Sequence, residues 1–209
     1  YNEKQQGKSY AFNAGAKKAK YDFIACVDAD SYPLPDSLDY VMGYFNDSKV
    51  GAVTTKMVVK KPKSLAERFQ DIEYIYSNFL LTAFDFLDSV YVARGPLSVY
   101  RKNVFNSIGG FLPADITPTE DMEITFRLRK AGYIVKSSKS AKVYTSVMPT
   151  WTKLYWQRVR WNRGSMINFW MHRDMMLDPK YSFFGVVIMP FVWVTMLMVG
   201  IIIYYLLKR

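Results

Sequence analysis

The chain ends in a long stretch without charge, which constrains the fold more than any other part of the sequence. The 25 residues from Phe183 to Leu207 carry no charged side chain, and Lys208 and Arg209 follow them. A helix rises about 1.5 Å per residue, so this run can cross a hydrocarbon core of about 30 Å. The pattern predicts a transmembrane helix over 183–207. The alternative is a buried helix of a water-soluble protein, which is seldom this long.

The segment before this run, residues 151–180, mixes aromatic and long basic side chains. Trp151, Trp161 and Trp170 are interspersed with Arg160 and Arg173. This mixture is typical of an amphipathic helix in a lipid headgroup layer, and the alternative is a helix that faces water. The formal net charge of +10 suits an anionic lipid surface or a phosphate-bearing substrate. Nucleic acid ranks last, because no compact basic motif occurs.

The excess of Lys and Arg before the uncharged run also indicates an orientation. Positively charged flanks stay on the cytoplasmic side of a membrane. The sequence therefore predicts a protein of the cell membrane whose globular part is cytoplasmic and contacts membrane lipid.

Residues 1–150 read as one α/β domain. A short apolar run over 21–27 predicts a buried strand, a helix follows Pro35, and 50–59 predicts the next strand. This strand-helix-strand order favours a parallel sheet. Further strands are expected over 90–101, interrupted at Gly95-Pro96, and over 133–135 and 143–146. A long helix is expected over 64–87, where Ser64 and Glu67 form a capping box. Another helix, capped by the side chain of Thr119, is expected to run to about 130 and to end at Gly132.

Several kinds of chemistry find no support in the sequence. Cys26 is the only cysteine and lies in an apolar stretch, so it reads as a small core residue. His172 is the only histidine and has no second His or Cys nearby, which argues against a metal role. A Ser/His/Asp arrangement and a phosphate loop of the Gly-x-x-x-x-Gly-Lys type are both absent from the sequence.

Two acids, Asp28 and Asp30, follow the first predicted strand directly. Side chains two residues apart on a strand point to the same side, and ligands bind at the carboxyl ends of strands in parallel sheets. The pair therefore predicts part of an oxygen site for Mg²⁺ or Mn²⁺, completed by phosphate and water. Two solvated loop acids are the alternative. The pair does not suit a glycosidase, whose two carboxylates must flank the scissile bond.

A second acidic pair, Glu120 and Asp121, opens the helix that starts after Thr119. Acids are favoured in a first helical turn by the helix dipole, and this alone explains them. The functional interpretation is that Asp121 is a general base that takes the proton from an attacking hydroxyl group.

A third cluster lies within about one helical turn. Arg160 can fork onto phosphate oxygens, Trp161 offers a flat apolar face to a sugar ring, and Gln157 lies beside them. A basic interfacial helix explains each of these residues separately. Near the start of the chain, Lys8 could reach a phosphate or could be a solvated lysine.

Five short motifs in this order resemble the family 2 inverting glycosyltransferases. The resemblance is to the membrane-embedded processive synthases of hyaluronan, chitin, cellulose and poly-N-acetylglucosamine. It covers nearly the whole chain and rests on Gly7-Lys8-Ser9-Tyr10-Ala11-Phe12-Asn13-Ala14-Gly15, Asp28-Ala29-Asp30, Gly95-Pro96-Leu97-Ser98-Val99-Tyr100-Arg101, Thr119-Glu120-Asp121 and Gln157-Arg158-Val159-Arg160-Trp161.

The resemblance implies a nucleotide-sugar-binding sheet of the GT-A type and a role for each motif. The donor would contact Lys8, Asp28, Asp30, Gln157 and Arg160, with the metal on Asp30 and Asp28. The same resemblance makes Asp121 the catalytic base and places the acceptor sugar against Trp161 and Glu120. The donor it implies is a UDP-sugar, UDP-N-acetylglucosamine or UDP-glucose, and the acceptor a growing polysaccharide.

Two departures from the family pattern set further expectations. Family members carry strand-helix units before the position of Tyr1 and several membrane spans, so we expect this chain alone to be weakly active or inactive. Two alternatives remain open at this point. One is a non-processive membrane glycosyltransferase that acts on a lipid or glycan. The other is a non-catalytic, membrane-anchored sugar-binding protein.

Overall fold

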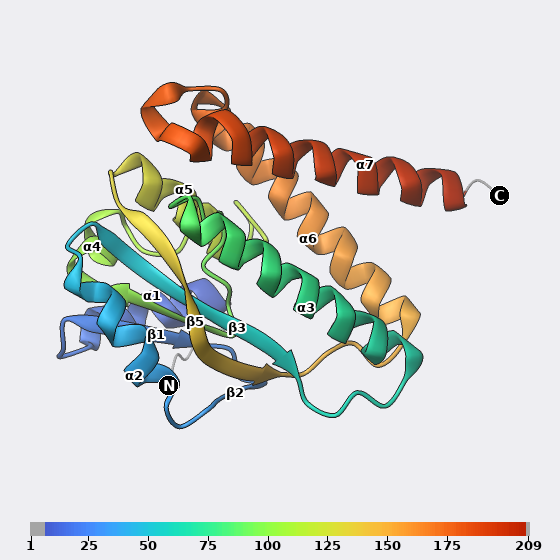
Figure 1. The fold of residues 1–209 in the computed structure, drawn as a ribbon, viewed down its shortest axis with the longest axis horizontal. Helices are drawn as coiled ribbons and strands as arrows, with labels where there is room; N and C mark the ends of the chain where they lie inside the picture. Colours follow the sequence, from blue (N-terminus) through green and yellow to red (C-terminus); the bar gives the residue numbers. More distant parts are fainter. Residues whose placement is uncertain (1–6, 208–209) are drawn as a thin grey trace.

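The computed structural model describes residues 7–207, with side chains at a few positions near the end excepted. Its core is a five-stranded mixed sheet in the order β1-β4-β3-β5-β2 (Figure 1). The strands are β1 (Phe23–Val27), β2 (Ser31–Pro33), β3 (Val50–Val59), β4 (Leu97–Arg101) and β5 (Ile134–Thr145). The helices are α1 (Lys8–Lys18), α2 (Ser37–Met42), α3 (Leu65–Phe86), α4 (Lys102–Ser107), α5 (Glu120–Lys130), α6 (Trp151–Met171) and α7 (Met189–Leu207). Three 3₁₀ turns (Gly43–Asn46, Arg173–Met175 and Pro179–Tyr181) and a π-helical turn (Phe184–Ile188) complete the elements.

The α/β class is confirmed, but the expected parallel arrangement is only partly correct. β3 and β5 are parallel, whereas β4 lies antiparallel between β1 and β3, and β2 is antiparallel to β5. Strand order depends on pairing between distant segments, which local periodicity does not encode. The two short strands expected over 133–135 and 143–146 are one strand, β5, with irregular register against β3. The strand expected over 90–101 is shorter and begins at Leu97.

The two faces of the sheet are covered by different helices. One face carries Ala52 and Tyr100, which belong to the larger apolar cluster together with residues of α1, α3, α5, α6 and α7. The other carries Val53 and Val99, which pack against α2 and the turn that follows it. Alternation along β3 and β4 thus separates two cores. Cys26 is 5% exposed, as expected for a core residue, and burial raises the pKa of its thiol to about 12.

The start of α3 confirms the predicted capping box. The Ser64 hydroxyl accepts from the Glu67 backbone N–H, and the Glu67 carboxylate accepts from the Ser64 N–H at 3.0 Å. Thr119 occupies the N-cap position of α5, as predicted, but its side chain makes no capping hydrogen bond there. Its hydroxyl instead accepts from Asn168 in α6 at 2.9 Å. Gly132 ends α5 with a φ of +85°, as predicted.

The predicted transmembrane helix over 183–207 is not found. Within the part of the chain that the structure describes, no helix is both long and apolar enough to cross a bilayer. The uncharged run is divided between the π-helical turn at Phe184–Ile188 and the 19 residues of α7. Its first part belongs to the domain core, because Phe184 is 1% exposed and its ring packs edge-on against Phe126 of α5. Hydropathy alone does not distinguish such core residues from lipid-facing ones.

Helices α6 and α7 contact each other beside the sheet (Figure 1). α6 begins at Trp151 after Thr150, whose hydroxyl accepts from the Lys153 backbone N–H. It occupies most of the segment expected to be an interfacial helix, and Trp151, Trp156 and Trp170 are all more than half exposed. The segment is thus helical and rich in exposed aromatic side chains, and its contact with lipid stays a prediction.

Candidate functional site

Four of the residues that the sequence singles out lie together where α1, β1 and α5 meet. Lys8 forms ion pairs with Asp28 at 2.6 Å and with Glu120 at 2.8 Å. Asp121 follows Glu120 in the first turn of α5 and is partly buried. Motifs more than 110 positions apart in the sequence therefore form one charged cluster, which we call the acid cluster: Lys8, Asp28, Glu120 and Asp121.

Lys8 remains a cation in this setting. Burial lowers its pKa, but attraction to Glu120 and hydrogen bonds to both carboxylates outweigh that effect and raise the pKa well above its ordinary value. A fixed positive charge between two acids keeps them in place and partly neutralises them. The cluster is therefore arranged before any ligand enters.

Asp121 has the property that a general base needs near neutral pH. Burial raises its pKa to about 6, and the negative charge of Glu120 adds to that rise, while Lys8 and a hydrogen bond from the Met122 N–H oppose it. A carboxylate with this pKa is ionised at pH 7 and accepts a proton more readily than an ordinary aspartate does.

Gly95, the first residue of the Gly-Pro-Leu-Ser motif, lies directly against the acid cluster. A Cβ atom at this position would lie 2.7 Å from Asp28 Oδ2 and 3.1 Å from Lys8 Nζ. The backbone thus lies so close to the acid cluster that a side chain at this position would have to displace Asp28 or Lys8. Two buried hydroxyl groups fix the backbone just before Gly95. The Thr54 hydroxyl accepts from the Arg94 N–H, and the Thr125 hydroxyl accepts from the Ala93 N–H.

Asp30 is placed differently from Asp28. β1 ends at Val27, and the two acids flank a turn closed by the Ser31 N–H on the Asp28 carbonyl at 3.0 Å, so strand alternation does not align them. Asp30 is exposed, and its Oδ1 accepts a long bond from the Ser31 hydroxyl. Its backbone carbonyl accepts from the Ser146 N–H, which places it beside the end of β5.

Within residues 7–207, apart from the side chains left undescribed near the end, no three His, Cys, Asp or Glu side chains gather to hold a metal. The donors present nevertheless fit Mg²⁺ or Mn²⁺, which bind through one or two carboxylates plus substrate phosphates and water. Asp30 offers an exposed carboxylate, whereas one oxygen of Asp28 is held by Lys8.

The third motif lies on α6 and faces a shallow hollow. Gln157 and Arg160 line it with Met148, Thr152, Lys153 and Trp156, and its volume is about 420 Å³. Arg160 also reaches the Pro118 carbonyl at 3.5 Å, just before the turn that carries Asp121. The Arg158 guanidinium lies over the Trp161 ring, with its carbon 4.2 Å from the ring centre. Arg158 also donates to the Gln157 side chain at 2.7 Å. We call this region the α6 hollow.

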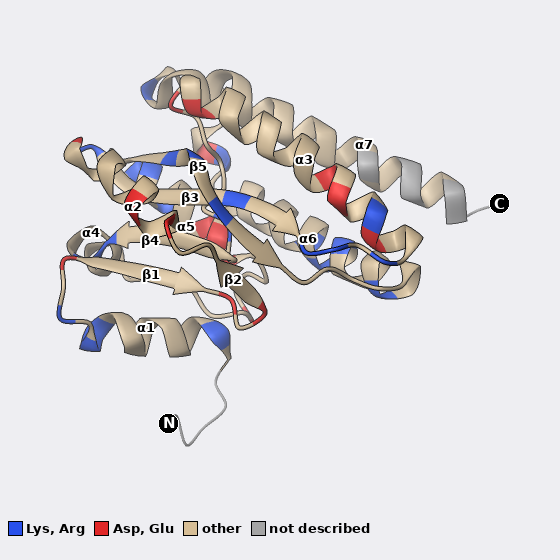
Figure 2. Cartoon of the chain, turned by 60° about the horizontal axis from the view of Figure 1, so that its bottom comes forward, with Lys and Arg blue, Asp and Glu red and all other residues tan. Residues whose placement is uncertain are grey.

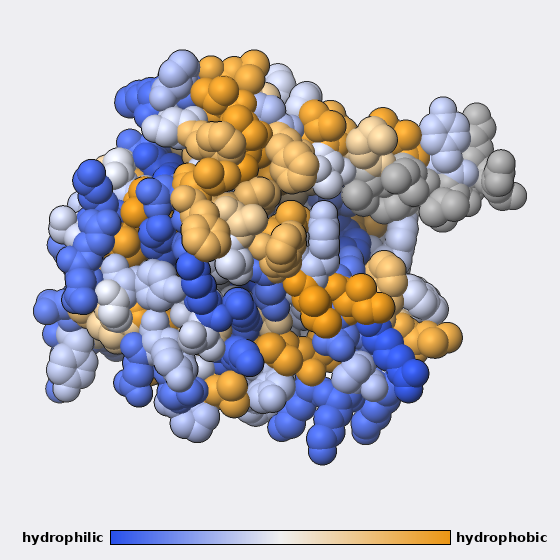
Figure 3. All heavy atoms as spheres, viewed as in Figure 1, coloured by the Kyte–Doolittle hydropathy of each residue, from blue (hydrophilic) through white to orange (hydrophobic). Residues whose placement is uncertain are grey.

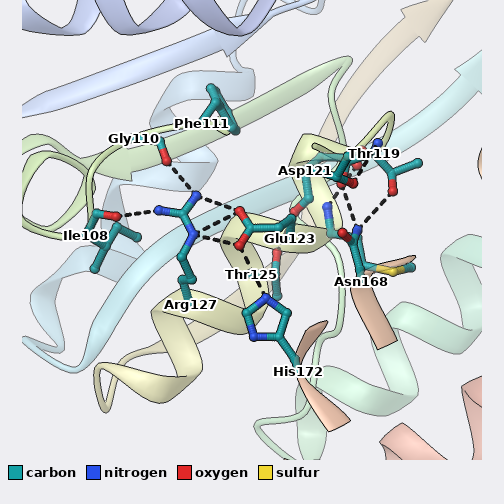
Figure 4. Close-up of polar contacts among 12 residues, drawn as sticks. Ile108, Gly110, Phe111, Thr119, Asp121, Glu123, Thr125, Arg127, Asn168 and His172 are labelled. Carbon is teal, nitrogen blue, oxygen red and sulfur yellow. Dashed lines mark hydrogen bonds and ion pairs between the residues drawn. The ribbon is translucent and has the colours of Figure 1, made fainter. Parts of the chain in front are cut away.

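Sequence reasoning missed the buried polar residues behind these motifs. Glu123 lies in α5, has a fully buried side chain and contacts His172, the C-cap residue of α6, at 3.2 Å (Figure 4). Arg127 donates to both oxygens of Glu123 and to the backbone carbonyls of Ile108 and Gly110. The i, i+4 spacing of Glu123 and Arg127 is a helical ion-pair pattern that could have indicated this contact.

Residues 1–164 match the family described as glycosyltransferase like family 2. This chain belongs to that family. It is 30% identical over 164 residues to a poly-beta-1,6-N-acetyl-D-glucosamine synthase of Staphylococcus aureus, a match that covers 78% of this chain and 39% of that protein. It is also 32% identical over 164 residues to the probable glycosyltransferase YdaM of Bacillus subtilis, covering 77% and 38%.

Solved structures show the same fold at lower identity. A mannosyltransferase of Pyrobaculum calidifontis, in complex with GDP-mannose and Mn²⁺, matches with a TM-score of 0.68 and 22% identity, over 87% of this chain and 48% of that one. GalNAc-T7 with UDP, GalNAc and Mn²⁺ matches with a TM-score of 0.54 and 15% identity, over 88% and 37%. These matches support a GT-A-like sheet. The chain spans about two fifths of the length of the curated relatives it matches.

Proposed function

We propose that this chain carries the catalytic centre of an inverting glycosyltransferase that moves a sugar from a nucleotide-sugar to a glycan hydroxyl group. The observation that carries the proposal is the acid cluster, in which Lys8 joins Asp28 to Glu120 directly beside Asp121. Membership of the family supports the reaction class. The relatives named for poly-N-acetylglucosamine synthesis favour UDP-N-acetylglucosamine as donor, with UDP-glucose as the next choice.

Each part of the site takes a distinct role in this reaction. Asp121 removes the proton from the acceptor hydroxyl, and its pKa of about 6 keeps it available as a base at neutral pH. Arg160 and Gln157, on the α6 hollow, grip the diphosphate, while Lys8 and Asp28 hold the donor from the sheet side. Trp161 and Glu120 contact the acceptor sugar. Asp30, with Asp28, would hold Mg²⁺ or Mn²⁺, which supplies positive charge to the leaving diphosphate.

We also propose that the protein works at a membrane surface with a polysaccharide acceptor. Apolar side chains gather over α3 and the start of α7 in Figure 3. On α3 this exposed face consists of Leu65, Phe69, Ile72, Ile75, Tyr76, Phe79 and Phe86, each at least 48% exposed. Contiguous exposed apolar surface of this kind marks an interaction site, and lipid suits its aromatic content. Flotation of the protein with anionic vesicles tests this part.

The catalytic assignment is tested by Asp121→Asn in the complete gene product, assayed in membranes with UDP-N-acetylglucosamine. Loss of the base should lower kcat by about 10²- to 10⁴-fold, because a general base contributes that much. UDP affinity should stay near the unaltered value, because the substitution keeps the shape of the side chain. Turnover within about twofold of the unaltered protein would remove Asp121 from the role.

A further inference from the structure

One face of α6 packs against the start of α5. Two residues of α6 and the residue that follows its end, spaced by four, form that face. Gly164, Asn168 and His172 are all buried, the last two at 0% and 5% exposure. Residues four apart lie on the same side of a helix. Gln157 and Arg160 lie on the preceding turns of the same helix.

The contact at Gly164 is the closest of the three. A Cβ atom at position 164 would lie 2.4 Å from Thr119 Oγ1, 2.7 Å from Thr119 Cγ2 and 3.0 Å from Pro118 Cγ. A residue larger than glycine would therefore move α6 away from the segment that leads into Asp121. Pro118 is also the residue whose carbonyl Arg160 reaches.

Asn168 fixes the same segment by hydrogen bonds. Its Nδ2 donates to the Thr119 carbonyl at 3.0 Å and to the Thr119 hydroxyl at 2.9 Å (Figure 4). The Thr119 hydroxyl thus links two helices instead of capping its own. This pair of bonds sets the rotation of α6 relative to the start of α5.

His172 completes the face at its far end. Its Nε2 lies 3.2 Å from Glu123 Oε1, and Arg127 holds the other side of the same carboxylate at 2.6–2.8 Å (Figure 4). Since Arg127 also binds the carbonyl of Gly110, the loop that leads to Pro118 is tied to the same point. Thr119, which precedes α5, and Glu123 within α5 lie on either side of Asp121 in the sequence.

From this geometry we infer that Gly164, Asn168 and His172 are positioning residues that fix the Arg160 guanidinium relative to the Asp121 carboxylate. The inference rests on the proposed function for its consequence in catalysis. The contacts with Thr119 and Glu123 act on both sides of Asp121, and Arg160 lies one turn from Gly164. A shift of α6 would therefore change the distance between the diphosphate grip and the base.

The principal test is a size exchange across the closest contact. Gly164→Ala should lower kcat/KM for the donor by about 10- to 100-fold, since a misplacement of about 1 Å can cost that much. Adding Thr119→Ala removes the two nearest of the three atoms that the new methyl group meets, so the double variant should recover at least about tenfold of that loss. Gly43→Ala is the matched control, because a Cβ atom there meets nothing within 4 Å.

A second readout does not depend on turnover. Calorimetric titration with UDP should show that Gly164→Ala weakens binding when Arg160 is present and has little further effect in Arg160→Ala, because the effect passes through that side chain. His172→Gln, which retains a donor to Glu123, should keep more activity than His172→Ala. Circular dichroism confirms that each variant folds.

The outcomes separate this inference from the proposed function. Inactivity of the unaltered complete gene product, or full activity in its Asp121→Asn variant, contradicts the proposed function, and the UDP titration still decides the positioning role. Full activity and full UDP affinity in Gly164→Ala overturn the inference while leaving the proposed function intact. A folded double variant no more active than Gly164→Ala, together with additive losses of UDP affinity, also overturns it.

Discussion

The acid cluster and the α6 hollow differ in two respects, the sign of their excess charge and whether that charge is paired within the protein or exposed. In the acid cluster, Lys8 partly neutralises Asp28 and Glu120 through contacts of 2.6 and 2.8 Å. In the α6 hollow, Arg160 and Lys153 are exposed, and Arg160 makes one long hydrogen bond to a backbone carbonyl. Figure 2 shows the basic residues along α6 and the acids near the ends of β1 and α5. The charged groups of the acid cluster thus hold one another in place without a ligand, whereas the α6 hollow presents exposed positive charge to a ligand.

This difference indicates which region tolerates change. A preorganised cluster loses its function when its geometry shifts, because each group depends on the others. An open basic surface loses binding in proportion to each charge removed. Effects of substitution should therefore be large and concerted in the acid cluster, and smaller and confined to affinity in the α6 hollow.

Among the substitutions that compare the two regions, the largest effect is expected from Gly95→Ala. The added methyl group would meet Asp28 Oδ2 at 2.7 Å and displace the Lys8–Asp28 pair, so kcat/KM should fall by about 10²-fold. Steady-state kinetics with the donor measures this change, and Gly43→Ala again serves as the control. If Gly95→Ala were as active as the control, the acid cluster would not be preorganised in the sense described above.

A smaller effect, restricted to binding, is expected from Arg160→Ala. A hydrogen bond to a charged group contributes about 1.5–3 kcal/mol, so UDP affinity should fall by about 10- to 100-fold. Arg163→Ala removes an exposed arginine from the same helix and should change affinity little. Calorimetry measures both variants. Equal losses in the two would show that α6 attracts the nucleotide by general charge and not through a specific contact.

The smallest effect concerns pH. Asp121 must be ionised to accept a proton, so kcat/KM should fall as pH decreases through about 6, the pKa of Asp121. Glu120 raises that pKa by repulsion, and Glu120→Gln should therefore move the fall to lower pH. The measurement is a pH–rate profile at constant ionic strength. A profile that shifts to higher pH in this variant would contradict the electrostatic assignment.

The sequence predicted the local features well and the long-range ones poorly. The capping box of Ser64 and Glu67 and the end of α5 at Gly132 depend on neighbouring residues, and both are confirmed. The insertion of β4 between β1 and β3 depends on pairing with distant strands and was not foreseen. The Thr119 hydroxyl was predicted as a cap and is instead taken by a residue 49 positions away.

The same limit applies to the candidate site. The motifs identified Lys8, Asp28, Glu120 and Asp121, which the structure brings together, because residues that carry charge at strand and helix ends are visible in a sequence. The supporting residues were not visible, since a buried Glu123 or His172 looks like any polar residue until its partners are known. The uncharged run misled for a related reason, because its first turn packs on Phe126.

Cys26 has a practical consequence. It is the only cysteine among the 209 residues, it pairs with Ser98 across β1 and β4, and its thiol is 5% exposed with a pKa of about 12. Thiolate and access are both required for alkylation. The rate at which this thiol is alkylated therefore reports how often the apolar core around β1 opens, two residues from Asp28, without any added label.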